Sequence, residues 1–167
     1  MTTMSPNRRH DDEPSESGQA LVEFALVIPI ALVLLFGIIA ICFLGFQNSS
    51  LHNGASAGSR EASIQTSLVT PTGGQYCESG QPTSIEQAVS RAAVGIPVNA
   101  APLCAASQSA TQLTQTPNVA DKVNITVTCV GGCATPSSVK VSVSYNAHGI
   151  SFTDPMTATS QTPVMGP

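Results

Sequence analysis

The dominant feature of the hydropathy pattern is one long apolar run near the N-terminus. No charged residue occurs between Phe24 and Phe46, and four of the five phenylalanines lie in this run. As a helix rising 1.5 Å per residue, the run spans roughly 35 Å, which is enough to cross the ~30 Å hydrocarbon core of a bilayer. It is also longer than the about 7–15 apolar residues of a cleavable secretory signal. We therefore expect a retained transmembrane and stalk helix over residues 19–66.

Beyond this helix, short periodic segments alternate with stretches rich in turn residues. Residues 70–82 are rich in Pro, Gly, Ser and Thr and predict a loop. The sequence from Thr83 to Glu86 offers a capping box, and apolar residues at helical spacing follow it as far as Ile96. A short helix that ends before a proline is expected here, and residues 97–119 are expected to be irregular.

Two segments near the C-terminus alternate apolar and polar residues with a period of two. One runs from Val123 to Cys129 and the other from Val139 to Tyr145, with a turn-rich connector between them. The pattern predicts an antiparallel hairpin with one buried face, and a third strand is expected within residues 150–164. The predicted fold class is α+β: the long helix is followed by a small domain, residues 67–167, with one helix on a short antiparallel sheet.

Composition and motif content narrow the class of function. Charged residues make up 10% of the chain and the net charge is −4, so no basic surface for nucleic acid is expected. No phosphate-binding glycine motif and no nucleophile elbow occur. A catalytic triad would have to use His148, with Asp154 as its partner, and we interpret His148 as a surface-loop residue. We expect no enzyme activity and no cofactor.

The cysteines indicate the compartment of the C-terminal domain. Cys42 lies inside the apolar run, and Cys77, Cys104, Cys129 and Cys133 follow it. An even number of cysteines after a membrane segment indicates disulfides in an oxidising compartment, so we expect an extracytoplasmic, disulfide-stapled domain. The Lys and Arg count on the two sides of the helix, two against one, also favours a cytoplasmic N-terminus.

The cysteine spacing favours disulfides over a metal site. No His or Cys partner lies at zinc-like spacing from Cys129 and Cys133, so a local disulfide between these two is favoured and no metal is expected. Cys77 would then pair with Cys104. Crossed pairings stay open, because four cysteines allow three connectivities.

The start of the apolar run carries a recognisable combination of residues. A glycine, Gly18, is followed by four uncharged residues, by Glu23 and by the uninterrupted apolar helix. This arrangement resembles the class III signal of type IV pilins and pseudopilins. The segment GQALVEFALVIPIALVLLFGII resembles more narrowly the N-terminus of TadE-like proteins, which are pseudopilins of tight-adherence (Flp) pilus systems. The resemblance covers about residues 17–66 and includes the pair Arg60–Glu61; Phe24, where major Flp pilins tend to have Tyr, fits the TadE-like branch.

The resemblance implies processing and assembly. A prepilin peptidase would cut between Gly18 and Gln19 on the cytoplasmic side and remove the leader, residues 1–18. Glu23, now the fifth mature residue, would pair with the free α-amine of a neighbouring subunit. Two other interpretations are pairing of Glu23 with the amine of its own chain, one helical turn away, and a solvated carboxylate at the membrane interface.

The function implied is that of a pseudopilin-like or minor-pilin-like structural component of a tight-adherence pilus assembly or secretion machinery. The chain would cross the bacterial cytoplasmic membrane once. Its partners would be the lipid bilayer, the prepilin peptidase, other pilins or pseudopilins, and an inner-membrane assembly platform. Two alternatives remain: an uncleaved membrane-anchored surface protein whose outer domain binds a ligand or partner, and a small extracytoplasmic enzyme, against which the missing catalytic motif argues.

Overall fold

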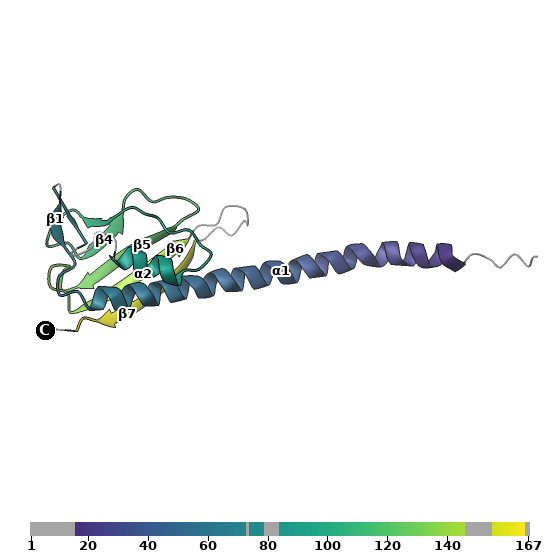
Figure 1. The fold of residues 1–167 in the computed structure, drawn as a ribbon, viewed down its shortest axis with the longest axis horizontal. Coiled ribbons are helices and arrows are strands. Elements are labelled where there is room, and N and C mark those ends of the chain that lie inside the picture. The colour runs from purple at the N-terminus through teal and green to yellow at the C-terminus, as the bar shows by residue number, and fades with distance from the viewer. Residues whose placement is uncertain (1–15, 73, 79–83, 146–154, 166–167) are drawn as a thin grey trace, which may run out of the picture. The chain divides into compact units, whose positions relative to one another are not determined.

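The structure is a computed structural model that describes residues 16–72, 74–78, 84–145 and 155–165 (Figure 1). The chain divides into two compact units, Met1–Cys42 and Phe43–Pro167. The elements in chain order are α1 (Glu16–Ser63), β1 (Thr70–Thr72), β2 (Gln75–Cys77), α2 (Ser84–Ala92), β3 (Leu103–Ala105), β4 (Gln112–Gln115), β5 (Val123–Val130), β6 (Ser138–Tyr145) and β7 (Met156–Pro163).

The first unit contains the N-terminal part of α1. By length and composition, α1 is the one helix of the described chain that is apolar enough to cross a membrane, and none of its most apolar stretch is buried. The helix continues through Pro29, which removes one backbone N–H donor. Because the helix begins at Glu16 and ends at Ser63, it starts earlier and stops slightly earlier than the expected range of residues 19–66.

The second unit is built on a seven-stranded antiparallel meander. Its strand order is β1-β2-β3-β4-β5-β6-β7, so every strand pairs with its neighbour in sequence. The predicted hairpin is β5 and β6, in register with Val127 opposite Val141, and the expected third strand is β7. The α+β fold class, with one helix on an antiparallel sheet and two disulfides, is confirmed.

Two of the expectations for irregular segments were wrong. Residues 70–82, predicted as a loop, contain β1 and β2, and residues 97–119 contain β3 and β4. These strands are only three or four residues long, too short to show a period of two, and their pairing is set by neighbouring strands. Buried Gln115 fixes β4: its side-chain Oε1 accepts from the amide of Ile125 (2.8 Å), and its Nε2 donates to the carbonyl of Asn99 (2.7 Å).

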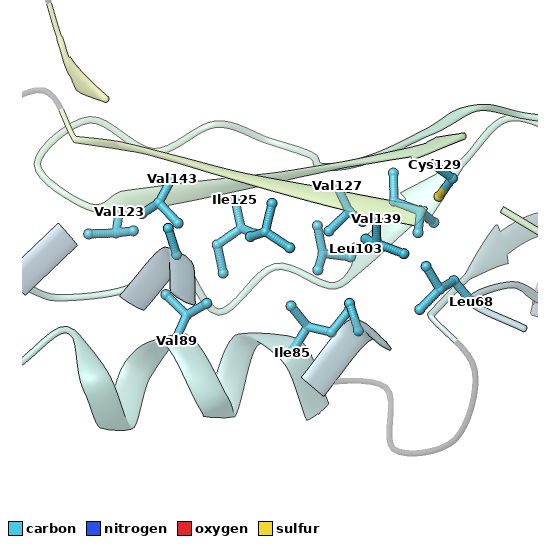
Figure 2. Packing of buried hydrophobic residues seen from close by; sticks show 14 of the residues in the cluster. Leu68, Ile85, Val89, Leu103, Val123, Ile125, Val127, Cys129, Val139 and Val143 are labelled. Atoms are coloured by element: carbon cyan, nitrogen blue, oxygen red, sulfur yellow. The ribbon is translucent and has the colours of Figure 1, made fainter. Parts of the chain in front are cut away.

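The short helix α2 lies where the apolar spacing predicts it, although it ends at Ala92, before the expected position. Gly95 follows in the left-handed region, with φ of 81°, and terminates the segment ahead of Pro97. Ile85 and Val89 point from α2 into the buried face of the sheet, towards Val123, Ile125 and Val143 (Figure 2). These side chains are almost completely buried.

The C-terminal part of α1, which lies in the second unit, also belongs to this core. Its buried residues repeat at helical spacing and most of them are small: Gln47, Ser50, Leu51, Gly54, Ala55, Gly58, Ser59, Ala62 and Ser63. A Cβ atom added at Gly58 would lie 2.8 Å from Cγ2 of Val89 and 3.3 Å from Cγ1 of Val141. The small residues therefore let α1 approach both α2 and the sheet closely, so the Gly54-x-x-x-Gly58 spacing serves packing within the chain.

Candidate functional site

The peptide bond between Gly18 and Gln19 lies in the first turn of α1, which begins at Glu16. Both residues are exposed, and a Cβ atom added at Gly18 would meet no other atom within 4 Å. A glycine inside a helix costs about 1 kcal/mol relative to alanine. Packing gives no reason for that cost at Gly18, in contrast to Gly58.

Glu23 is exposed on the same helix, one turn after Gln19. Its neighbours Leu21, Val22 and Phe24 are exposed apolar residues. Within the described residues, no hydrogen bond or ion pair joins Glu23 to its own chain. A carboxylate in such apolar surroundings is costly when the surface is covered by lipid or by other helices, unless a cation pairs with it.

From Phe24 onward, the helix of the first unit exposes apolar residues on every side. Within the first unit, the exposed large apolar residues are Leu21, Val22, Phe24, Leu26, Val27, Ile28, Ile30, Leu32, Val33, Leu34, Leu35, Phe36, Ile38, Ile39 and Ile41. An apolar surface of this extent on a helix is typical of a segment covered by a bilayer or by neighbouring helices. The free cysteine, Cys42, is exposed at the end of this unit.

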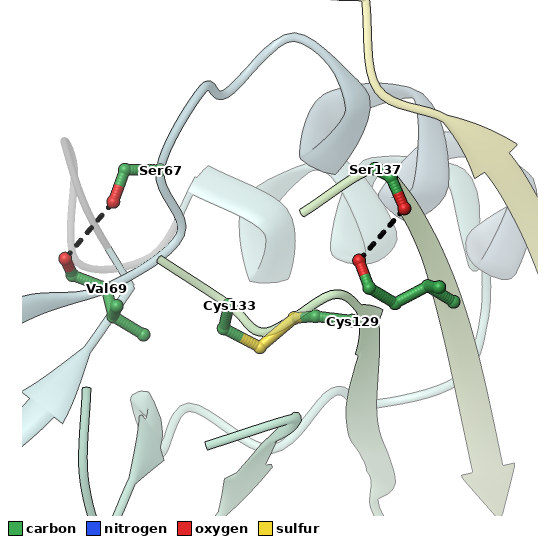
Figure 3. Close-up of a disulfide and its surroundings, with 6 residues drawn as sticks. Ser67, Val69, Cys129, Cys133 and Ser137 are labelled. Carbon is green, nitrogen blue, oxygen red and sulfur yellow. Dashed lines mark hydrogen bonds between the residues drawn. A yellow bond between two sulfur atoms is a disulfide. The ribbon is translucent and has the colours of Figure 1, made fainter. Parts of the chain in front are cut away.

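The other four cysteines are paired in the second unit. Cys77 is joined to Cys104 and Cys129 to Cys133, which is the connectivity that the spacing favours. Cys77 and Cys104 are direct partners of adjacent strands and are half-buried. The bond between Cys129 and Cys133 is buried and closes the connector after β5, where the hydroxyl of Ser137 donates to the carbonyl of Val130 (Figure 3).

An electrostatically unusual group in the described part of the second unit is Glu78, which no local sequence pattern singles out. Its side chain is 3% exposed, and its Oε1 accepts a hydrogen bond from the amide of Ile85 (2.8 Å) at the start of α2. The Ser84 hydroxyl also donates to this oxygen, and the Gln65 amide nitrogen donates to Ser84 Oγ (2.7 Å). Glu78 therefore connects the end of β2, the segment after α1 and the start of α2.

Burial raises the pKa of Glu78 above its ordinary value of 4.5. Hydrogen bonds from Ser84, Ile85 and Gln65 oppose this effect, and the nearby charge of Glu61 adds to it. The pKa of Glu86, in the first turn of α2, is also raised, first by burial and then by the charge of Glu78. Thr83, the first residue of the expected capping box, lies outside the described residues. At the start of α2, the amide of Ile85 donates instead to the carboxylate of Glu78.

The described residues show no arrangement for catalysis. His148 and Asp154 lie outside them, and His52 is exposed on α1. The ranges described hold no group of three or more His, Cys, Asp or Glu that could bind a metal ion. A hollow of about 250 Å³ beside β3 and β4 is lined by Gln75, Pro102, Thr114, Thr116 and neighbouring small residues, and by no acid or base.

A comparison with known protein families finds a match, and it lies on α1. Residues 18–60 match the sequence model of a family described as TadE-like protein. The match begins at Gly18, includes Glu23 and extends into the small-residue part of α1, and it confirms the resemblance drawn from the sequence. No match is found among curated proteins or among solved structures.

Proposed function

We propose that this chain, a TadE-like protein by its residues 18–60, is a pseudopilin-like or minor-pilin-like component of a tight-adherence pilus assembly or secretion machinery. It is a structural protein, anchored by α1 in the bacterial cytoplasmic membrane with its C-terminal unit outside. A prepilin peptidase removes residues 1–18, and the apolar helix stays as the anchor and assembly surface. Other pilins or pseudopilins and an inner-membrane assembly platform are its partners.

One observation carries this proposal: the family match begins on a helix where Gly18 and Glu23 make no contact with other described residues that would explain their presence. Gly18 meets no neighbour that would require a glycine, and Glu23 has no partner among the described residues. The residues around them form an exposed apolar surface. Recognition by a peptidase and pairing with a second subunit would give each of these residues a function outside its own chain.

The chemistry of Glu23 follows from cleavage. Hydrolysis after Gly18 would leave a free α-amine on Gln19, one helical turn from Glu23. Inside a bundle of apolar helices, an unpaired carboxylate is strongly unfavourable, so an amine of a neighbouring subunit would pair with it. Such a pair would fix the axial register between subunits. The apolar helix surface would supply the contact area between subunits. The ion pair would set the axial position of one subunit relative to the next.

The orientation with the C-terminal unit outside is supported by the two disulfides. Thiols are kept reduced in the cytosol, whereas extracytoplasmic compartments allow disulfides to persist. Both bonds lie in the unit Phe43–Pro167, beyond the apolar run. This placement agrees with the expected cytoplasmic N-terminus.

The first experiment is to determine the N-terminal residue and mass of the protein from membranes of its native host. We expect a chain that begins at Gln19. The variant Gly18→Val should remain full length, whereas Gly37→Val, at a glycine equally free of neighbours, should be processed normally. A wild-type chain that still carries Met1 or Thr2 would contradict the proposal and favour an uncleaved, membrane-anchored surface protein.

A second experiment separates processing from assembly. The variant Glu23→Gln keeps the size of the side chain and removes its charge, so it should be cut after Gly18 yet fail to crosslink to other pilins in the membrane. Glu61→Gln, which changes a carboxylate outside the apolar run, is the matched control and should assemble. Assembly of Glu23→Gln at the wild-type level would show that the carboxylate is not needed for register.

A further inference from the structure

We infer that the loop after α2, centred on Val94, contacts the outer surface of the lipid bilayer, so that the second unit touches the membrane through a segment other than its anchor α1. This inference rests on the proposed insertion of α1. It assigns a partner, a lipid surface bearing anionic headgroups, to a surface of the second unit that the family match does not cover. Three observations support it.

The first observation is the position of the loop after α2 relative to the end of the apolar run. Phe46 is the last residue of the apolar run, and the polar residues Gln47 and Asn48 follow it. A Cβ atom added at Gly95 would lie 3.3 Å from Cε1 of Phe46, so the loop backbone lies against the Phe46 ring. The hydroxyl of Ser50 donates to the carbonyl of Val94 (2.8 Å). The loop is therefore fixed beside the turn of α1 where the apolar run ends.

The second observation is that the outer unit leaves this apolar surface uncovered. Val94 is 63% exposed and Phe46 is 52% exposed. The flanking residues Ala93 and Ile96, in contrast, are buried in the core. Val94 therefore points away from the core and lies beside the end of the apolar run. A bilayer boundary that reaches Phe46 and Gly95 would bring Val94, the residue before Gly95, into contact with lipid, and removing this apolar area from water is favourable.

The third observation is the charge around the exposed valine. Arg91 is exposed one turn before Val94. Lys122 precedes Val123, whose amide donates to the carbonyl of Pro97 (2.8 Å), so a second cation lies on the same end of the unit. The acidic residue next to it is Asp121, which is exposed. Long cationic side chains beside an apolar tip suit the boundary between acyl chains and anionic headgroups.

The test measures the environment of probes on the full chain in vesicles of phosphatidylcholine and phosphatidylglycerol. In a Cys42→Ser background, an environment-sensitive fluorophore is attached at Val94→Cys, at Val130→Cys or at Ile38→Cys. Val130 is the matched control, because it is also an exposed valine (52%) but lies beside the buried Cys129–Cys133 disulfide. Mass spectrometry confirms that the two native disulfides stay intact.

We expect the probe at position 94 to emit at shorter wavelength than the probe at 130. It should be quenched severalfold more by lipids with nitroxide headgroups and less by aqueous iodide. Equal behaviour at 94 and 130, together with quenching of position 38 by nitroxides on the acyl chains, would overturn this inference alone. Failure to quench position 38 would overturn the membrane insertion of α1 and the inference with it.

Dilution distinguishes lipid from a second copy of the chain. Protection of position 94 from iodide that persists when the protein is diluted in excess lipid supports contact with the bilayer. Protection that disappears on dilution would assign the surface to a neighbouring subunit and would overturn the inference. Replacing phosphatidylglycerol with phosphatidylcholine should weaken the protection, because Arg91 and Lys122 then lose their anionic partners.

Discussion

At the scale of single residues, the buried carboxyl of Glu78 makes stability depend on pH. Its pKa is raised because burial disfavours the charged form more than its hydrogen bonds favour it. A folded-state pKa above the unfolded value means that the native state holds the proton more tightly. The stabilisation is therefore fully present below pH 4.5, the ordinary value, and is lost as the pH rises through the raised pKa.

The corresponding prediction concerns Glu78→Gln, which keeps an oxygen acceptor for the amide of Ile85 and removes the titration. The free energy of unfolding of the wild type should fall relative to this variant as the pH rises from 4.5 upward. Urea unfolding of the full chain in mild detergent, followed by pulse proteolysis, measures the free energy of unfolding of the wild type and of the variant. Glu86 titrates in both proteins, so parallel pH profiles would show that Glu78 is not the responsible group.

A second residue-scale prediction concerns Gly58. A methyl group here would lie 2.8 Å from a buried atom of Val89, so Gly58→Ala should destabilise the second unit by about 1–3 kcal/mol through overpacking. The higher helix propensity of alanine offsets roughly 0.5–1 kcal/mol of this cost, so a net loss of stability is expected. The urea midpoint measures the change. Gly45→Ala, where an added Cβ meets nothing within 4 Å, should show no loss, and an equal response of the two variants would contradict the packing argument.

At the scale of elements, α1 is one continuous helix with two kinds of surface. Its first part exposes large apolar side chains all round, whereas residues 47–63 bury a face made mostly of small residues against α2 and the sheet. The first surface suits lipid or other helices, and the second suits close packing. The same helix is therefore suited to two tasks, a membrane anchor in its first part and a core element of the second unit in its last part.

The two disulfides should differ in their response to reductant. Cys77 and Cys104 are half-buried, and Cys104 borders the hollow beside β3 and β4, whereas Cys129 and Cys133 are buried. A thiolate must reach the sulfur that it attacks, so the bond joining β2 to β3 should open first. Alkylation after mild reduction, read by mass spectrometry, gives the order. Simultaneous opening would indicate that global unfolding controls reduction.

Removing each disulfide tests its contribution to stability. In the loop-entropy description, the longer loop between Cys77 and Cys104 is worth roughly 3–4 kcal/mol and the loop between Cys129 and Cys133 about 2 kcal/mol. Double alanine variants of each pair, unfolded in urea, should follow this order. The reverse order would show that the buried packing of Cys129 and Cys133 outweighs loop entropy.

At the scale of the whole molecule, the unit that carries the core begins inside α1. Leu51, Ala55 and Ala62 are fully buried, and all three lie on this helix. We expect a fragment of residues 43–167 to form both disulfides and unfold cooperatively. A fragment of residues 67–167 should not, because truncating even one buried leucine typically costs about 2–5 kcal/mol. Urea unfolding of the two oxidised fragments checks this, and equal cooperativity would place the folding boundary after α1.

Much of the candidate site was predictable because it is local in sequence. Gly18, Gln19 and Glu23 form a pattern of fixed spacing on one helix, and no tertiary contact is needed to recognise it. Their processing and pairing stay predictions. Glu78 was not predictable in this way: it is one acidic residue in a stretch read as a loop, and its only local signal is a position six residues before the start of α2.

The sequence by itself determined the long apolar helix, the α+β class, the β5–β6 hairpin and the favoured cysteine pairing, because periodicity and spacing are local properties. Only the tertiary structure decided that β1 to β4 exist, since strands of three or four residues depend on their partners for hydrogen bonds. It alone also decided which small residues of α1 are buried, and that Gly95 lies against Phe46. Apart from the short turn between β1 and β2, where Thr72 pairs with Gln75, these features join residues distant in the chain, and no local pattern encodes such contacts.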